Sequence, residues 1–466
     1  MKLSLADAAT AMNALGDMSQ AQGQSQIAGV KTDSRAVGHG DVFVCLAGER
    51  VDGHNFAAQA ARQGALAIVA ERPLPELAES CPVLMVRDSL AALGQLGACW
   101  RDRTTATVIA VTGSAGKTSV KELLASILAQ MGETAKNYKN YNNQLGVPRN
   151  IMEFHGEERF WVLELGISEK HDMNELGALV RPDVAVIHNI GPVHLEGLGS
   201  IEGVARCKTD LLEFVQPGGR AFVSMDYPEL WAEATRRFPT VLGFSTQGHS
   251  DRFRASYLGG GKGGGRYLVH LDSFELDVTL PFFGDFFTEN VLAAATVAMQ
   301  LGAGPDEIQR GLETAELPEH RNVCIPAGEW TVLDDTYNAN PLSMERAIAN
   351  ARELAGERPL VCVLGDMKEL GPDAAKLHAG MAQSLAENRA AAVFFHGEHA
   401  DDLLDGLRGC DWNGPFFAID NPATLPELFA GLNLAPGVAL FKGSRSMRME
   451  RFADVLTGSL NGENQA

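Results

Sequence analysis

The stretch that decides the fold is Val108-Ile-Ala-Val-Thr-Gly-Ser-Ala-Gly-Lys-Thr118, an apolar run followed by a loop of small residues. β-branched residues before the loop and apolar residues at helical spacing after it predict a buried strand, a turn and a helix. Backbone N–H groups in such a turn can face one anionic group, and the positive end of the helix dipole favours the same charge. We therefore predict a phosphate cradle formed by Gly113, Ser114, Ala115 and Gly116.

The end of this loop indicates a nucleoside triphosphate as the ligand. Lys117 is placed to reach the terminal phosphates, and the Thr118 hydroxyl is placed to ligate Mg²⁺. The spelling is shorter than the general pattern G-x-x-x-x-G-K-[ST], because valine stands at position 111. A lone Gly-Lys-Thr also occurs by chance, but the strand and helix on either side favour phosphate binding.

Size, composition and charge describe a globular protein of several domains. The chain has 466 residues, of which 45% are hydrophobic and 21% charged, and its formal net charge is −20. This charge excludes the broad basic surface that a nucleic acid or an anionic membrane requires. The seven cysteines form no C-x-x-C pair, and no apolar run reaches the ~18 residues that span a bilayer. We expect reduced thiols, no membrane insertion, a cytoplasmic location and a monomer.

The chain divides into three α/β blocks, which we predict to be a small N-terminal domain, a central domain and a Rossmann-like C-terminal domain. Strand and helix signals alternate in the central and C-terminal blocks, which indicates mostly parallel sheets with right-handed crossovers. Two strand signals around a glycine tract predict an antiparallel appendage with a flexible hairpin tip. The predicted boundaries are residues 1–103, 104–319 and 320–466, with the appendage at 253–271.

Three polar residues of the central block stand where ligands of parallel sheets collect, beyond the carboxyl ends of strands. Glu164 ends an apolar run, so it is either an exposed strand end or a carboxylate that holds Mg²⁺. His194 is either a loop histidine or a metal ligand. Lys208, in what reads as the opening of a helix, is by itself no more than a solvated lysine.

Several motifs together resemble the Mur ligases, ATP-dependent enzymes that form amide bonds in cell-wall precursors. In the central block they are the phosphate loop, N-Y-N-N-Q-L-G-V-P at 140–148, E-L-G at 164–166 and N-I-G-P-V-H-L-E at 189–196. The stretches 333–341, 363–367 and 441–450 resemble the MurF-type branch, which adds D-alanyl-D-alanine. The stretches 31–35, 40–44 and 52–56 resemble the domain of that family that binds the UDP-muramyl substrate.

The resemblance implies that D-alanyl-D-alanine is joined to the tripeptide carboxylate of UDP-N-acetylmuramoyl-tripeptide, through an acyl phosphate formed from ATP. It implies catalytic roles for Lys117, His194, Lys208 and Arg321. It implies nucleotide binding by the loop from Gly113 to Thr118 and by Asn290, Arg321 and Asp335. Two Mg²⁺ ions would be held by Thr118, Glu164, His194 and Lys208, the lysine as a carbamate. The implied substrate-binding residues are Ser34, Arg35, Asn142, Asn143, Tyr337, Asn338 and Asn340.

Two positions depart from the family pattern, and other functions stay open. Glu289 stands where the family commonly has histidine before the asparagine, and Asp210 stands where it often has glutamate after the modified lysine. Within the enzyme class, the alternatives are a MurE-type ligase and a folylpolyglutamate synthase-like ligase. A nucleotide-dependent switch or a small-molecule kinase would share the phosphate loop but would leave the third-block motifs without a role.

Overall fold

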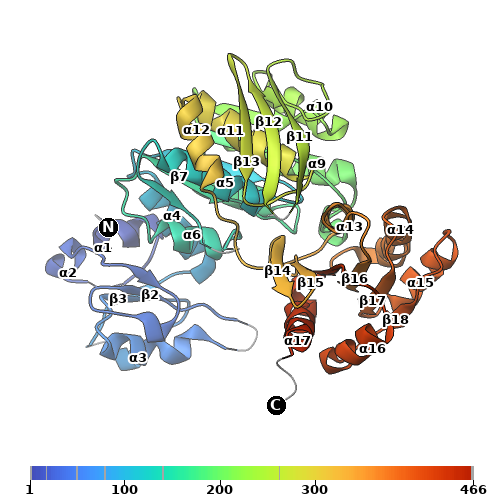
Figure 1. The fold of residues 1–466 in the computed structure, drawn as a ribbon. Helices are drawn as coiled ribbons and strands as arrows, with labels where there is room; N and C mark the ends of the chain where they lie inside the picture. Colours follow the sequence, from blue (N-terminus) through green and yellow to red (C-terminus); the bar gives the residue numbers. More distant parts are fainter. Residues whose placement is uncertain are drawn as a thin grey trace.

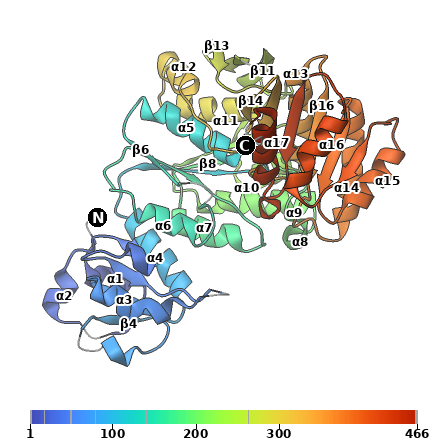
Figure 2. The same cartoon turned by 60° about the horizontal axis from the view of Figure 1, so that its bottom comes forward.

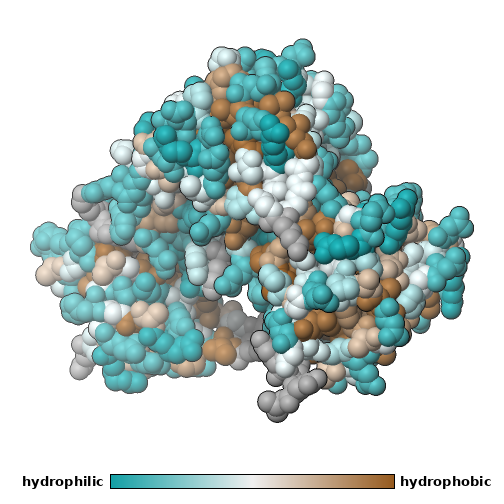
Figure 3. Space-filling model, in the orientation of Figure 1, coloured by the Kyte–Doolittle hydropathy of each residue, from teal (hydrophilic) through white to brown (hydrophobic). Residues whose placement is uncertain are grey.

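The structure, a computed structural model, describes residues 3–16, 18–48, 51–77, 80–138, 141–261 and 263–462. The chain forms three domains, as the sequence predicts. In Figure 1 the N-terminal domain lies at lower left in blue, the central domain at the top, and the C-terminal domain at lower right in orange and red. Figure 2 shows the central and C-terminal domains against each other with the N-terminal domain below them, and Figure 3 shows an opening between the two lower domains.

The N-terminal domain is a small parallel sheet with helices on both sides. Its strand order is β1-β2-β3-β4, and every pair of neighbours is parallel. The core of this domain continues through α4 into one face of the central sheet, so the two domains share buried apolar residues. The elements are β1 (Val30–Lys31), β2 (Val42–Val44), β3 (Ala67–Ala70), β4 (Val83–Met85), α1 (Leu5–Ala11), α2 (Gln20–Gln24), α3 (Ala57–Arg62) and α4 (Ser89–Arg101).

The central domain contains a parallel six-stranded sheet, with strand order β10-β9-β8-β5-β7-β6. The strands are β5 (Thr107–Thr112), β6 (Thr134–Lys136), β7 (Phe160–Glu164), β8 (Val184–Ile187), β9 (Arg220–Ser224) and β10 (Leu242–Phe244). The helices are α5 (Lys117–Ala129), α6 (Gly146–Ile151), α7 (Asp172–Val180), α8 (Leu195–Leu198), α9 (Ile201–Thr209), α10 (Pro228–Arg237), α11 (Phe287–Gln300) and α12 (Pro305–Glu313).

The interior of strand β5, residues 108–111, is apolar because both of its faces are covered, as is usual in parallel sheets. Ile109 and Val111 face α5 and α11, whereas Val108 and Ala110 face the side of α4 and α7. β5 pairs with β7 on one side and with β8 on the other. Consequently the residues that follow β5, β7 and β8 meet at one edge of the sheet, where the phosphate loop lies.

The predicted antiparallel appendage is present and has a third strand that the sequence reading did not predict. It consists of β11 (Phe253–Gly261), β12 (Gly264–Leu271) and β13 (Phe274–Leu280), and it packs on α11. The ladder extends into the glycine tract, with Gly260 opposite Gly265 and Gly261 opposite Gly264. The tract is therefore largely part of the two strands, and the flexible tip predicted for 259–265 is wrong over most of its length.

The C-terminal domain is the predicted Rossmann-like domain. Its sheet has the order β14-β15-β19-β16-β17-β18, in which only the pairing of β14 with β15 is antiparallel among the described strands. The strands are β14 (Val323–Ala327), β15 (Trp330–Asp334), β16 (Leu360–Gly365), β17 (Ala392–His396), β18 (Phe416–Ala418) and β19 (Val438–Lys442). The helices are α13 (Pro341–Ala355), α14 (Ala374–Glu387), α15 (Ala400–Arg408), α16 (Leu425–Gly431) and α17 (Glu450–Leu460).

Helix α13 of this domain lies against the central domain. It begins where Asn340 caps it, with Pro341 at the first helical position, which is a favoured start for a helix. Gly191 of the central domain packs so closely on Leu342 that a Cβ at position 191 would lie 3.0 Å from that side chain. Within the described residues, no helix combines the length and the apolar character needed to cross a membrane.

Candidate active site

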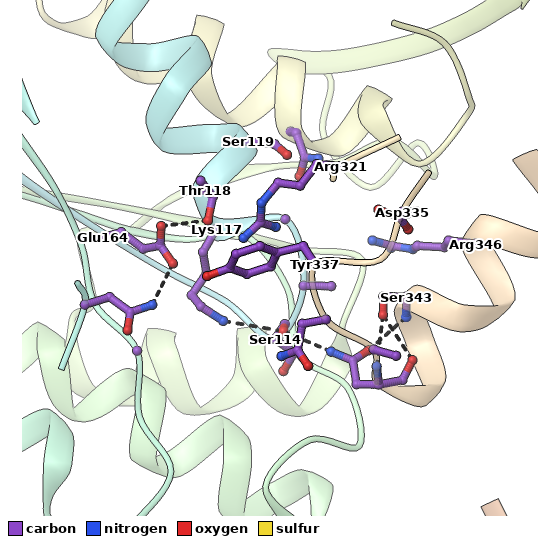
Figure 4. A pocket seen from close by; sticks show the side chains of 18 of the residues that line it. Ser114, Lys117, Thr118, Ser119, Glu164, Arg321, Asp335, Tyr337, Ser343 and Arg346 are labelled. Atoms are coloured by element: carbon purple, nitrogen blue, oxygen red, sulfur yellow. Dashed lines mark hydrogen bonds between the residues drawn. The ribbon is translucent and has the colours of Figure 1, made fainter. Parts of the chain in front are cut away.

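A cavity of about 430 Å³ lies between the central and C-terminal domains, where the phosphate loop faces the start of α13 (Figure 4). Most of the site residues predicted from the sequence line this cavity, although they come from segments far apart in the chain. They are Ser114, Ala115, Gly116, Lys117, Thr118, Asn142, Asn143, Glu164, His194, Asn290, Arg321, Asp335, Tyr337, Asn338 and Asn340.

The turn from the loop into α5 depends on glycine at position 116. Gly116 has a φ of +76°, and a Cβ at this position would lie 2.6 Å from Oδ1 of Asn290. Asn290 is buried, and its Oδ1 has no hydrogen-bond partner among the described residues. A buried amide oxygen without a partner is costly in a folded protein. Asn290 therefore offers an acceptor to a ligand in the cavity.

Two residues after β8 form the floor of the loop. The Oδ1 atom of Asn189 accepts hydrogen bonds from the backbone N–H groups of Ser114 (2.8 Å) and Ala115 (3.0 Å). The ring of His188 lies between the carbonyl oxygens of Thr112 (3.0 Å from Nδ1) and Ala115 (2.5 Å from Nε2). Burial lowers the pKa of His188 to about 3, while the contacts with the two carbonyl oxygens oppose this shift.

This floor corrects the phosphate cradle expected from the sequence. The N–H groups of Ser114 and Ala115 point to Asn189, so they are not turned toward the cavity as predicted. Gly113 does not line the cavity, since its backbone packs on His188, where a Cβ would lie 2.3 Å from Cε1. The N–H groups left for a phosphate are those from Gly116 into the first turn of α5, which have no partner within the helix.

Lys117 lies at the bottom of the cavity and folds back on the loop. Its Nζ donates to the carbonyl oxygen of Gly113 at 2.8 Å and is 3.5 Å from that of Ser114. Burial lowers the pKa of Lys117, Glu164 opposes this shift, and Arg321 adds to it. Figure 4 shows Lys117 and Arg321 on either side of the Tyr337 ring. The site thus gathers positive charge in a chain that is strongly acidic overall.

Glu164 and Thr118 supply oxygen atoms next to the loop. Glu164 is buried at the end of β7, where Oε2 accepts from the Thr118 hydroxyl (2.8 Å) and Oε1 accepts from Nδ2 of Asn142 (2.7 Å). Nζ of Lys121 is 3.9 Å from Oε2. Carboxylate and hydroxyl oxygens are the ligands that Mg²⁺ prefers, and here they lie beside the predicted phosphate position. The pair therefore fits a magnesium ion.

Arg321 enters the cavity from the segment that connects the central and C-terminal domains. Its guanidinium carbon lies 3.9 Å from the centre of the Tyr337 ring, which is a cation–π arrangement. Nε of Arg321 and the hydroxyl of Tyr337 are buried without a hydrogen-bond partner among the described residues. Burial raises the pKa of Tyr337, and Arg321 opposes this shift. Both groups are available to a ligand with acceptor oxygens.

The C-terminal wall of the cavity is held by a buried lysine that the sequence reading did not select. Nζ of Lys442 lies 2.5 Å from Oδ2 of Asp335 and donates to the carbonyl oxygen of Asn338 at 2.9 Å. Asn340 joins the two domains, because its Nδ2 donates to the carbonyl oxygen of Ser114 at 3.3 Å while its Oδ1 caps α13. These contacts place the stretch from 335 to 340 over the phosphate loop.

His194 lies on the opposite side of the cavity at a second contact between the domains. It precedes α8 with a φ of +51°, and its Nδ1 contacts Oε2 of Glu369 in the C-terminal domain. This contact lowers the pKa of Glu369. Within the described part of the chain, no three side chains of the His, Cys, Asp and Glu types gather as a ready metal site. The predicted magnesium ligands include a threonine hydroxyl and a lysine, which are not among those four residue types.

Comparisons with known proteins agree with this arrangement. Three family models match in order: the Mur ligase family catalytic domain at residues 26–100, the Mur ligase middle domain at 111–298, and the Mur ligase glutamate ligase domain at 320–445. A relative from Escherichia coli (strain K12) is 34% identical over 437 residues, which cover 92% of this chain and 93% of the relative. The chain belongs to the Mur ligase family.

Several relatives that are 30–34% identical to this Mur ligase over most of its length share one name. The Escherichia coli protein is called UDP-N-acetylmuramoyl-tripeptide–D-alanyl-D-alanine ligase. A crystal structure of MurF from Acinetobacter baumannii superposes with a TM-score of 0.89 at 31% identity and covers 98% of this chain and 99% of its own. The MurF ligase from Thermotoga maritima, solved in complex with ADP, has a TM-score of 0.84 at 27% identity and covers 96% and 100%.

Three further predicted residues of this Mur ligase do not line the cavity. Lys208 is 1% exposed and lies in the last turn of α9, so the prediction that it opens a helix is wrong. Burial, with a smaller effect of Lys117, lowers its pKa well below the usual value. Ser34 and Arg35 are in the N-terminal domain, where Ser34 Oγ lies 3.3 Å from Gln59 Oε1 and Arg35 pairs with Asp33 at 2.6 Å.

Sequence reasoning missed several residues that the fold brings to the site. Lys442 and Asn189 stand inside motifs quoted above, and their signal was a polar residue directly after an apolar strand. Arg346 and Ser343 of α13 also line the cavity. These two carried no signal, since a polar residue on a helix usually faces solvent.

Proposed function

We propose that this chain is an ATP-dependent ligase that joins D-alanyl-D-alanine to the terminal carboxylate of UDP-N-acetylmuramoyl-tripeptide. The product is the UDP-N-acetylmuramoyl-pentapeptide precursor of peptidoglycan, with ADP and phosphate. The observation that carries the proposal is a second cavity of about 600 Å³ that shares Ser114, Lys117 and His194 with the first. A phosphate site is thereby continuous with a second, cation-lined pocket on the C-terminal domain. The names of the relatives support the same reaction.

On the nucleotide side, the chain supplies positive charge and hydrogen-bond donors. Lys117, Arg321 and the N–H groups at the start of α5 would bind the phosphates, and Asn290 and Asp335 would bind the rest of ATP. An Mg²⁺ ion at Thr118 and Glu164 would neutralise phosphate charge. His194 and a carbamylated Lys208 are the proposed ligands of a second ion. That the MurF ligase from Thermotoga maritima was solved in complex with ADP supports nucleotide binding by this chain.

The proposed reaction has two steps. The terminal carboxylate of the tripeptide attacks the γ-phosphorus of ATP, ADP leaves, and an acyl phosphate forms. The amine of D-alanyl-D-alanine then attacks the carbonyl carbon, the C–O bond to phosphate breaks, and the amine loses a proton as the amide forms. Positioning and charge neutralisation account for most of the catalysis of such a transfer.

On the acceptor side, the second cavity suits a peptide that ends in a carboxylate. Its wall from the C-terminal domain includes Lys368, Arg445 and Arg448, and Asn338 and Asn340 lie between the two cavities. The carboxylate of D-alanyl-D-alanine would bind these cations, which leaves its amine free to point toward Lys117 and the acyl phosphate. Asn142 and Asn143, on the side of the central domain, would contact the tripeptide.

The N-terminal domain would bind the UDP-muramyl part of the substrate through Ser34 and Arg35, across the opening seen in Figure 3. We propose that the domains close when ATP and the UDP-substrate are bound, which protects the acyl phosphate from water. Small-angle scattering should show compaction with both ligands. Closure is excluded by an unchanged radius of gyration. We further propose a cytoplasmic monomer that does not bind nucleic acid.

The decisive experiment is a coupled phosphate-release assay with ATP, UDP-N-acetylmuramoyl-tripeptide and a panel of acceptors. We expect turnover with D-alanyl-D-alanine and none with diaminopimelate, lysine or glutamate. Turnover with a single amino acid would instead indicate a MurE-type or folylpolyglutamate synthase-like ligase. Phosphate release that does not depend on any amine would indicate a nucleotide-dependent switch. Tripeptides ending in lysine and in diaminopimelate, assayed in parallel, identify the preferred third residue.

A further inference from the structure

A buried carboxylate connects the C-terminal domain to the phosphate loop. Glu289 lies in the first turn of α11 and is 5% exposed. Its Oε2 accepts hydrogen bonds from Nδ2 of Asn189 at 3.1 Å and from Nη2 of Arg346 at 3.2 Å. The hydroxyl of Tyr227 lies 3.4 Å away. One oxygen atom thus receives a donor from the floor of the loop and a donor from α13 of the other domain.

On the loop side, Asn189 transmits this contact to the backbone of the phosphate loop. Its Oδ1 accepts from the N–H groups of Ser114 (2.8 Å) and Ala115 (3.0 Å), and its Nδ2 donates to the carbonyl oxygen of Ala115 at 3.0 Å. The side-chain amide is therefore fixed by the loop at one end and by Glu289 at the other. A shift of Glu289 would move the amide that holds the loop.

On the side of the C-terminal domain, Arg346 is the cation that makes the buried carboxylate tolerable. Burial raises the pKa of Glu289, whereas Arg346, Asn189 and Tyr227 oppose that shift. If α13 moved away, Glu289 would remain buried without its cation, and removal of one partner from a buried ion pair is strongly destabilising. The docking of α13 therefore decides whether the buried carboxylate of Glu289 keeps Arg346 as its cation.

We propose that Glu289 is a positioning residue that couples the docking of α13 to the geometry of the phosphate loop through Asn189. The proposal rests on the proposed function, since it requires that the loop binds the phosphates of ATP. Among the described residues, Glu289 does not line the nucleotide cavity but lines a neighbouring cavity of about 520 Å³, which shares Phe286 and Arg346 with it. The proposed effect on the phosphates therefore runs through Asn189. The loop would reach its binding geometry fully only when the C-terminal domain is docked.

The first test measures nucleotide binding by Glu289→Ala and Glu289→Gln. Isothermal titration with ADP and Mg²⁺ should show affinity reduced on the order of tenfold for Glu289→Ala, because the amide of Asn189 and the guanidinium of Arg346 both lose their acceptor. Glu289→Gln keeps a neutral acceptor for Asn189 and should lose less. In the ligation assay, KM for ATP should rise in the same order, while kcat and KM for D-alanyl-D-alanine stay close to wild type.

A double-mutant cycle tests the coupling itself. Arg346 lines the nucleotide cavity, so its single variant mixes a direct and an indirect effect. The cycle of Glu289→Gln and Arg346→Met removes this ambiguity. We expect the loss of ADP affinity caused by Glu289→Gln to be clearly smaller in the Arg346→Met background. Equal losses in both backgrounds would overturn the proposal.

Tyr257→Phe is the matched control, because it removes another contact between the central domain and the same helix. The hydroxyl of Tyr257, in β11, donates to Oε1 of Glu353 in α13 at 2.5 Å and accepts from the N–H of Gly284 at 3.2 Å, and neither of these contacts involves Glu289 or Asn189. ADP affinity should be unchanged in this variant. An equal loss in Tyr257→Phe would show a general loosening of the domain contact and would reject a specific role of Glu289.

Two further measurements distinguish a failure of this proposal from misfolding of a variant and from a failure of the proposed function. Thermal unfolding of each variant shows whether it is folded, and Glu289→Gln decides the question if Glu289→Ala does not fold. If the wild-type chain does not bind ADP, the proposed function fails before Glu289 is tested. If the wild type binds ADP and ligates while Glu289→Ala has the wild-type affinity, only the role of Glu289 is rejected.

Discussion

Two regions of the central domain bury lysine side chains in opposite ways. Beside the phosphate loop, Lys121 is fully buried, yet its Nζ donates to the carbonyl oxygen of Asn137 at 2.8 Å and lies 3.0 Å from a carboxylate oxygen of Glu122. In the last turn of α9, Lys208 is 1% exposed, and its Nζ forms no hydrogen bond or ion pair with any other described residue. The same residue type is therefore a paired cation in one place and an amine without a partner among the described residues in the other.

The difference indicates that Lys208, and not Lys121, is held in the neutral form that can react with CO₂. A buried ammonium group without acceptors is costly, so burial lowers the pKa of Lys208 well below its usual value and favours the neutral amine. A neutral amine can react with CO₂ to form a carbamate and release a proton, whereas an ammonium group cannot. The environment of Lys208 thus fits the carbamate implied by the family resemblance.

Loss of the Lys208 side chain should have the largest effect. We expect Lys208→Ala to abolish ligation while ADP binding stays close to wild type, because the residue lies outside the nucleotide cavity. A short added carboxylate such as acetate should restore part of the activity by replacing the carbamate. Phosphate release and isothermal titration measure the two properties. Full activity of Lys208→Ala would refute the carbamate assignment.

Removal of the loop lysine should impair both binding and turnover. For Lys117→Ala we expect kcat/KM to fall by ~10²–10³, because the developing phosphate charge loses a positioned cation. ADP affinity should fall as well, in contrast to Lys208→Ala. Lys376→Ala, a change of an exposed lysine on α14, is the control and should behave as wild type. If Lys117→Ala binds ADP normally, the loop does not hold the nucleotide phosphates.

The unpaired lysine should also reduce stability. In buffer purged of CO₂, Lys208→Met should be more stable than wild type, with an unfolding free energy larger by roughly 0.5–2 kcal/mol. Its unfolding temperature should therefore be higher. The folded pKa of Lys208 lies below the unfolded value of ~10.4, so the destabilisation is present at neutral pH and fades as pH rises toward 10. Thermal unfolding at pH 7 and pH 10 measures both effects. A wild type more stable than Lys208→Met at pH 7 contradicts this reading.

The smallest effect should come from charges that are already paired near α9. Arg236 and Arg237 lower the pKa of Glu233 on α10 to about 2. Because the folded pKa is below the unfolded one, this pairing stabilises the fold above pH ~4.3 and is lost as pH falls toward 2. Urea unfolding of Glu233→Gln should show a deficit of at most about 1 kcal/mol at pH 7. The deficit should shrink at pH 3, and a deficit independent of pH would rule out the ion pair as its cause.

Much of the fold could be predicted from the sequence because the strongest patterns are local. The run before the phosphate loop is β5, and the helix predicted after it is α5. Short or weakly apolar strands were missed, among them β6 and β13, because edge strands are short and alternate with polar residues. The glycine tract was misread as a loop tip, since glycine propensity does not reveal that neighbouring strands pair through it.

The sequence predicted which site residues lie together where they follow neighbouring parallel strands. It did not predict the direction in which backbone N–H groups of the phosphate loop point. Glu164 and Thr118 meet as expected, because the ends of neighbouring parallel strands adjoin. The direction of the Ser114 and Ala115 N–H groups could not be predicted, since it depends on Asn189 from another strand. The assignments of Ser34 and Arg35 remain proposals, because the structure keeps them in a separate domain.

By itself, the sequence determined that a phosphate loop follows a buried strand, that three α/β domains are present, and which family they form. These properties rest on periodicity and on motifs in which neighbouring residues act together. Only the tertiary structure decided that Asn189 holds the loop, that Glu289 connects it to Arg346, and that the Lys208 side chain is buried with no partner in the part of the chain that the structure describes. The physical reason is that hydrogen bonding and burial depend on what lies across the sheet or the domain boundary, and sequence spacing does not encode those neighbours.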